Sequence, residues 1–156
     1  MQVLSAFAIG LFSVCSLVSS AEAKDTHVLV TPGEIEWGPA PKALPAGAQA
    51  ALLFGDPSKE GLFALRLKLP AGYAIPPHTH SGNEVVTVIS GTFNFGLGES
   101  ADRKATKPLP AGSFIAMKPG TAHFAYADEE TVIQVTTNGP WGIKWVNPAD
   151  DPQKTQ

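Results

Sequence analysis

Three of the four histidines in this 156-residue chain are spaced so that they could converge on one point. His78 and His80 are two residues apart, so on a strand they face the same side with Cα atoms about 6.6 Å apart. Glu84 follows after a Ser-Gly-Asn segment that can turn the chain. It is two and four residues before Val86 and Val88, so on a strand all three side chains face the same side. A carboxylate with this parity can face inward beside the two imidazoles.

A third imidazole comes from His123, which follows a Pro-Gly turn and shares the parity of Ala125 and Ala127. These small neighbours leave room beside a ligand. Three neutral imidazoles and one carboxylate form a site of intermediate softness that suits Fe, Mn, Zn, Ni or Cu. We therefore predict one divalent transition metal ion per chain, held by His78, His80, Glu84 and His123, with no strong selectivity among these metals. The fourth histidine, His27, is interpreted as a surface residue.

The pattern around these residues predicts an all-β domain. The chain has 15 glycines and 14 prolines, and its charged fraction is 16%, against about 25% in an ordinary domain. No window of a dozen residues has helical periodicity, which argues against a helical bundle. Short segments of strand character lie at 27–30, 35–37, 49–54, 63–69, 84–90, 92–96, 113–117, 123–127, 131–136 and 142–146. Such spacing is typical of a β-sandwich or a jelly-roll barrel.

Charge and cysteine content exclude several function classes. The formal net charge of −3 and the pI near 5.7 argue against nucleic-acid binding through a basic surface. The single cysteine, Cys15, excludes a disulfide framework, a CxxC redox pair and a cysteine-rich zinc site. The chemistry of this protein is therefore expected to depend on histidine and carboxylate groups.

The first 23 residues are predicted to be a secretory signal peptide. An apolar stretch, Leu4–Val18, is followed by Ala21-Glu22-Ala23, and cleavage is predicted after Ala23. An uncleaved anchor helix is the alternative, because no Lys or Arg precedes the apolar stretch. We expect a periplasmic or secreted protein with an irregular arm at 24–48, a single barrel at 49–147 and a flexible tail at 148–156.

The first histidine segment resembles a known sequence motif. Gly72, His78, His80, Glu84 and Gly91 fit the pattern G-x5-H-x-H-x3-E-x6-G at every fixed position. This is the first motif of the cupin superfamily, and a chance match in a chain of this composition is roughly one in ten thousand.

The second histidine segment resembles the second cupin motif, G-x5-P-x-G-x2-H-x3-N, with two departures. Gly112, Gly120 and His123 fit, whereas Lys118 stands where Pro is usual and Ala127 where Asn is usual. Neither departure affects a metal ligand of the family. The resemblance covers roughly residues 49–146 and implies a small single-domain cupin, a jelly-roll β-barrel with a three-His, one-Glu metal site.

The resemblance does not fix a reaction, because one fold hosts many functions. We expect an exported metal-dependent enzyme, of the dioxygenase or the lyase/isomerase type, that acts on a small oxygenated organic molecule. Catalytic roles are predicted for His80 and, by family analogy, for Glu84 as a general base. Two alternatives stay open: a non-catalytic metal-dependent binding or storage cupin, and a structural cupin without an ion.

Pocket and interface residues are predicted with less support from spacing. The expected apolar wall of the pocket consists of Tyr73, Phe93, Phe95 and Met117, which flank the motif strands. The tryptophans Trp37, Trp141 and Trp145 are interpreted as packing or interface residues, with a pocket role as the alternative. A homodimer is expected, with Val28–Val30 and Trp37 at the contact. No nucleic acid partner and no stable membrane span after signal cleavage are expected.

Overall fold

The computed structural model describes residues 27–154. The predicted signal peptide lies outside the described residues, and so does its cleavage site. Between residues 27 and 154, no helix is long and apolar enough to cross a membrane.

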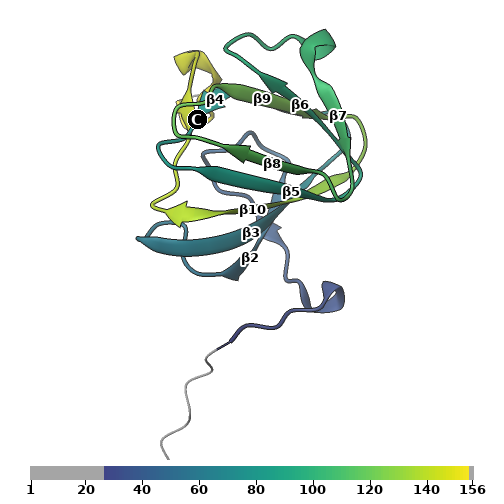
Figure 1. Ribbon diagram of the computed structural model, residues 1–156, viewed down its shortest axis with the longest axis vertical. Coiled ribbons are helices and arrows are strands. Elements are labelled where there is room, and N and C mark those ends of the chain that lie inside the picture. Colours follow the sequence, from purple (N-terminus) through teal and green to yellow (C-terminus); the bar gives the residue numbers. More distant parts are fainter. Residues whose placement is uncertain (1–26, 155–156) are drawn as a thin grey trace, which may run out of the picture.

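Two antiparallel sheets face each other and enclose the core (Figure 1). The six-stranded sheet has the order β1-β2-β3-β10-β5-β8, and the five-stranded sheet has the order β11-β4-β9-β6-β7. The strands are β1 (Gly38–Pro39), β2 (Gln49–Phe54), β3 (Gly61–Leu69), β4 (Tyr73–Thr79), β5 (Glu84–Ser90), β6 (Thr92–Leu97), β7 (Lys107–Pro110), β8 (Phe114–Met117), β9 (His123–Ala127), β10 (Thr131–Gly139) and β11 (Lys144–Trp145). Three short 3-10 helices are η1 (Pro32–Glu34), η2 (Arg103–Ala105) and η3 (Pro148–Asp150). The predicted all-β, single-domain fold is confirmed.

The core forms because alternate residues of the central strands face the space between the sheets. On β3, Leu65 and Leu67 are almost fully buried, and their register partners on β10 are Val135 and Ile133. Arg66 lies between them on the outer face, where its Nε donates a hydrogen bond to Gln134. This period of two is the pattern from which the strand was predicted.

The structure differs from the sequence prediction mainly at proline-rich or exposed segments. Residues 27–30 and 35–37 form no strand, and the short strand β1 begins one residue later, at Gly38. The edge strand β7 was not predicted, because Pro108 and Pro110 cannot donate hydrogen bonds to a ladder. Such prolines are tolerated at a sheet edge, which is where β7 lies.

Both segments that flank the predicted barrel contain ordered structure. Leu44, from the predicted irregular arm, is 5% exposed and belongs to the hydrophobic core together with Ala48. The Tyr73 hydroxyl donates a hydrogen bond of 2.5 Å to the Pro45 carbonyl and so fixes this loop to β4. The predicted flexible tail begins with η3, which the side chain of the preceding Asn147 caps by accepting from the backbone N–H of Ala149.

Candidate metal centre

The four predicted ligands come from one end of the two sheets. His78 lies near the end of β4, and His80 follows directly after that strand. His123 begins β9, which runs antiparallel to β4 and pairs with it, so that His78 and His123 are register partners. Glu84 begins β5 in the opposite sheet and faces the histidines across the core.

A register shift in β4 turns His78 inward. Tyr73 and Ile75 face the core, so strict alternation would place the even-numbered His78 outside. Between Ile75 and His78 the strand gains one residue relative to β9, at Pro76 and Pro77. Prolines interrupt a ladder, and a bulge changes which side of the strand the following residues face. His78 is therefore 5% exposed.

Two further contacts hold the ligand segments together. The backbone N–H of Gly120, in the turn before His123, donates to the carbonyl of His80 over 2.9 Å. The Thr137 hydroxyl donates to the carbonyl of Asn83, the residue that precedes Glu84. The first contact joins the two histidine motifs, and the second fixes the turn that carries the chain into the opposite sheet.

The ligand atoms converge in a buried volume. One ring nitrogen from each of His78, His80 and His123 lies within 4.8 Å of the other two. The Oε2 atom of Glu84 lies 3.3 Å from Nε2 of His80 and 3.4 Å from Nε2 of His123. All four residues are between 4% and 6% exposed. The structure thus brings together all four residues that were predicted as metal ligands.

Backbone carbonyls determine the tautomer of each histidine. Nδ1 of His78 lies 2.7 Å from the Pro76 carbonyl, and Nδ1 of His80 lies 2.7 Å from the Gly142 carbonyl. Nδ1 of His123 similarly lies 3.0 Å from the carbonyl of Thr121. Because a carbonyl oxygen only accepts, each Nδ1 carries the proton and each neutral ring has its lone pair on Nε2.

Burial keeps these groups in the forms that bind metals. Burial, together with repulsion from His123, lowers the pKa of His78 to about 3, and burial also lowers the pKa of His80. For Glu84, burial alone would raise the pKa, but the contact with His123 and the nearby His80 outweigh it and lower the pKa. At neutral pH, His78 and His80 are therefore neutral and Glu84 is a carboxylate.

This arrangement fits a divalent transition metal. Three lone pairs and a carboxylate oxygen point to one place, and Nε2 of His80 is buried without a hydrogen-bond donor among the described residues. Converging acceptors that lack a donor repel one another, and leaving a buried polar group unsatisfied costs about 1–3 kcal/mol. A cation at their centre removes both costs. Nitrogen and oxygen ligands held by outer hydrogen bonds are typical of such sites.

The cavity beside the ligands is small, with a volume of about 30 Å³. Phe93, Phe95 and Met117 line it, as the sequence predicted. Tyr73 does not line it: the side chain is buried farther along β4, and its hydroxyl binds Pro45. Burial raises the pKa of this phenol to about 12, which keeps it protonated.

Three residues line the cavity from loops, namely Leu44, Trp141 and Ile143. Sequence reasoning missed Leu44 and Ile143 and gave a pocket role for Trp141 only as an alternative. Trp141 lies between β10 and β11, where no periodic pattern predicts the direction of a side chain. Ile143 fell within the strand predicted at 142–146, but the strand observed there, β11, begins only at Lys144. The Trp141 ring stacks on His80, with centroids 5.4 Å apart and planes 12° apart. A pocket role for a tryptophan had been the alternative interpretation of the sequence, and Trp141 is the residue that fits it.

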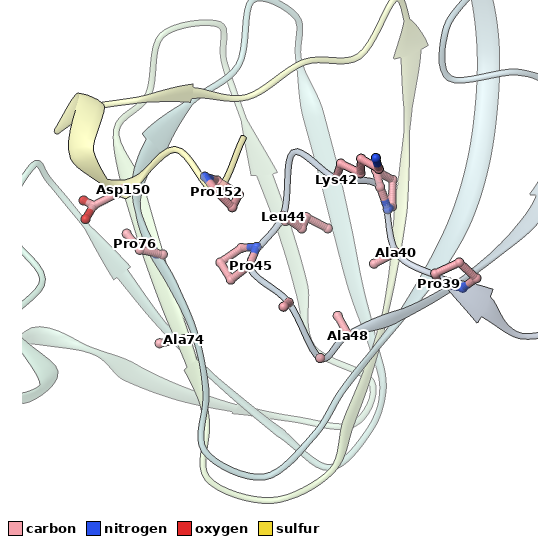
Figure 2. A pocket seen from close by; sticks show the side chains of 13 residues that line it. Pro39, Ala40, Lys42, Leu44, Pro45, Ala48, Ala74, Pro76, Asp150 and Pro152 are labelled. Atoms are coloured by element: carbon pink, nitrogen blue, oxygen red, sulfur yellow. The ribbon is translucent and has the colours of Figure 1, made fainter. Parts of the chain in front are cut away.

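A larger cavity of about 660 Å³ lies outside the barrel, between the loop at 39–48, β4 and the C-terminal segment (Figure 2). Prolines and alanines dominate its lining, and its only charged residues are Lys42 and Asp150. It holds no cluster of metal-ligating or nucleophilic side chains. Leu44 lines both cavities. We therefore assign the functional site to the smaller cavity, where the reactive groups lie.

Solved structures with the same fold share little sequence with this chain. An RmlC-like cupin from Shewanella frigidimarina aligns with a TM-score of 0.54 and 18% identity, over 70% of this chain and 87% of its own. The polyketide cyclase RemF from Streptomyces resistomycificus aligns with a TM-score of 0.65 and 15% identity, over 81% and 89%. A putative acetylacetone dioxygenase from Methylibium petroleiphilum aligns with a TM-score of 0.61 and 19% identity, over 85% of this chain and 89% of its own. These alignments show that the fold is a cupin fold.

Sequence comparison gives a relative and a family. Germin-like protein subfamily 3 member 3 of Arabidopsis thaliana is 40% identical over 65 residues, which are 41% of this chain and 31% of that protein. The match therefore spans about a third of the length of that relative. A family match covers residues 20–144, which is most of the chain. This cupin, with its buried three-His and Glu cluster, belongs to the family described as Domain of unknown function (DUF4437).

Proposed function

We propose that this protein is an exported, mononuclear metal-dependent enzyme that acts on a small oxygenated organic molecule. The observation that carries the proposal is the convergence of three imidazole lone pairs and one carboxylate in a buried cavity. His78, His80, His123 and Glu84 would hold the ion. A structural ion needs only a closed set of ligands, whereas this set opens onto a cavity.

A divalent ion bound here would act as a Lewis acid towards an oxygen atom of the substrate or towards water. The protein supplies orientation and a site for a proton. The Gly142 carbonyl fixes Nδ1 of His80, and the His80 ring stacks against Trp141. These two contacts fix the direction in which the Nε2 lone pair of His80 points. The ionised Glu84 carboxylate could accept a proton from a molecule in the cavity at a stage when it does not hold the ion.

The names of two structural neighbours support the reaction class. One is named a polyketide cyclase and another a putative acetylacetone dioxygenase, and both kinds of substrate carry carbonyl oxygens. At 15% and 19% identity the likeness concerns the fold, so the substrate of this chain does not follow from theirs. Their names support, at the level of the fold, the proposal that this barrel performs chemistry on oxygenated carbon.

A second candidate, metal-dependent binding without turnover, is favoured by the size of the cavity. A volume of about 30 Å³ holds an ion with one or two water molecules, and an organic substrate needs several times more. In the enzymatic account the cavity must therefore widen when substrate enters. In the binding account the closed cavity is the working state.

Turnover assays distinguish the two candidates. The metal-loaded protein is incubated with diketones, catechols, organic acids and uronates while oxygen uptake and product formation are followed. The enzymatic proposal predicts conversion of at least one compound, with loss of that activity in Glu84→Gln. If the fully loaded protein converts none of them and takes up no oxygen, binding without turnover is the better account.

Export is the part of the proposal that rests on the sequence alone. Residues 1–23 supply the apolar stretch and the small residues before the cleavage site. Mass spectrometry of the protein recovered from the periplasm or medium of the producing cells tests this part. A mature N-terminus at Lys24 supports export with cleavage, and an intact Met1 on cytoplasmic protein contradicts it.

A further inference from the structure

Trp141 is held rigidly at the edge of the cavity by contacts on three sides. Its backbone N–H donates to the carbonyl of Pro57 over 2.8 Å, which ties the loop to the turn between β2 and β3. Its ring stacks on His80 and meets Phe63 edge to face, with centroids 6.1 Å apart. The next residue, Gly142, accepts from Nδ1 of the same histidine. The indole is therefore positioned before any ligand arrives.

The indole nitrogen of Trp141 is a buried donor without an acceptor. Nε1 is shielded from solvent, and no described residue accepts a hydrogen bond from it. A buried N–H in this state costs about 1–3 kcal/mol, and buried indole N–H groups usually find a partner. Since Trp141 lines the small cavity, the acceptor can come from a molecule that occupies this cavity.

The charge of the loaded cavity indicates what that molecule is. A divalent ion held by three imidazole ligands and one carboxylate ligand leaves a net charge of +1. No Lys or Arg is among the described residues that line the cavity, and most of the others are apolar. An uncompensated charge is unfavourable in such surroundings, so a ligand of charge −1 matches the site.

Trp141 belongs to the partly exposed side of the cavity lining. Nearly all lining residues are buried, and the partly exposed ones are Phe95, Trp141 and Ile143. The Trp141 ring therefore lies on the partly exposed side of the cavity, while its Nε1 is buried. From this position the ring also packs against a metal ligand.

Building on the metal centre proposed above, we propose that the cavity binds a small carboxylate and that the Trp141 indole N–H donates a hydrogen bond to one of its two oxygens. This assigns the ligand class, a monoanion with two adjacent oxygen atoms, and a carboxylate larger than formate requires the cavity to widen. Trp141 is a positioning residue in this scheme, since it orients the ligand and takes no part in bond making or breaking.

The test uses the zinc-loaded, ¹⁵N-labelled protein and formate, the smallest carboxylate. Proton–nitrogen NMR separates the indole signals of Trp37, Trp141 and Trp145, and the signal missing from Trp141→Phe identifies Trp141. Formate is expected to move the Trp141 indole proton downfield in a saturable way, with no such shift in metal-free protein. The Phe variant is expected to bind formate about tenfold more weakly by calorimetry, because a hydrogen bond to a charged group is lost.

Trp145→Phe is the matched control, because Trp145 lies 5.4 Å from His78 but does not line the cavity. It is expected to bind formate as the wild type does. A Trp141 indole signal that stays in place while zinc is held, or equal formate affinity in Trp141→Phe and wild type, overturns this inference and leaves the metal centre intact. A wild-type protein that holds no zinc overturns the metal centre itself. The NMR shift in the wild type decides the matter even if Trp141→Phe does not fold.

Discussion

His78 and His123 face each other as register partners on β4 and β9, with ring centroids 4.1 Å apart. Neither residue is near the other in sequence, so the pairing of two antiparallel strands creates half of the candidate metal centre. The register depends on the extra residue at Pro76 and Pro77, because without it His78 would point away from the core. The candidate metal centre therefore depends on this irregularity of β4.

Replacement of His80 by alanine is expected to abolish stoichiometric metal binding. His80 contributes one ligand nitrogen, and its loss should weaken affinity at least as much as loss of an outer hydrogen-bond partner, about 100-fold. Competition titration with a chromophoric chelator measures the change. His27→Ala is the control, since His27 is exposed and far from the cluster in sequence, and it should bind as the wild type does. Equal affinity in His80→Ala would mean that the ligands are wrongly assigned.

The metal-free protein is expected to lose stability as the pH falls below about 6.5. The folded-state pKa of His78 is about 3, below its ordinary value of 6.5, so between these values the unfolded chain binds more protons than the folded one. The free energy of unfolding then decreases as the pH falls. At pH 4.5, two units below the unfolded-state pKa of His78, the loss is about 2–3 kcal/mol. The lowered pKa of Glu84 acts in the same direction at lower pH.

Urea unfolding of chelator-treated protein between pH 7.5 and 4.5 measures this dependence. His78→Gln provides the comparison, because its side chain does not titrate. The variant should show a shallower pH dependence than the wild type, whatever its stability at pH 7.5. Parallel curves for the two proteins would show that His78 is not a buried neutral group.

Gly96→Ala is expected to destabilise the fold by about 1–3 kcal/mol. A Cβ at Gly96 would overlap the ring of Phe124, its register partner on β9, and Phe124 is fully buried. Chemical denaturation measures the loss. Gly33→Ala, where a Cβ meets nothing within 4 Å, should change stability by less than about 0.5 kcal/mol. A Gly96→Ala protein as stable as Gly33→Ala would be inconsistent with the packing of β6 against β9.

Association through the N-terminal arm remains a prediction. Val28 and Leu29 are 58% and 76% exposed, on an extended segment that leads away from the barrel (Figure 1). Exposed apolar side chains of this kind are typical of contact surfaces between chains. Light scattering should show a dimer at micromolar concentration and a monomer for Leu29→Asp. Leu97→Asp, at an exposed leucine on β6, is the control, and a monomeric wild type would refute the prediction.

All four clustered ligands could be predicted from sequence, but regular alternation explains only two of them. His78 faces inward because of the extra residue at Pro76 and Pro77, and His80 lies just beyond the end of β4, so these two were predicted from the spacing of their motif. Glu84 with Val86 and His123 with Ala125 follow the simple alternation. Tyr73 was placed in the wall wrongly, because proximity to a motif does not tell how far along the strand a side chain lies from the ligands. Its burial was foreseeable from its apolar ring, whereas its partner, the Pro45 carbonyl, was not.

The remaining lining residues depend on contacts between distant segments. Trp141 is placed by Pro57, and Leu44 reaches the core from a loop without periodicity. The local sequence does not encode the direction of either side chain, because side chains in loops do not alternate regularly. A single sequence can therefore indicate the metal ligands here but not the loop residues that line the cavity.

Elemental analysis of the protein matured in its own compartment tests the central claim most directly. The account predicts about one divalent transition metal ion per chain, removed by a strong chelator with a fall in melting temperature and restored on reloading. It also predicts that the identity of the metal follows supply. Less than about a tenth of an ion per chain after reloading, or undiminished metal in a protein lacking His78, His80 and His123, would contradict the account.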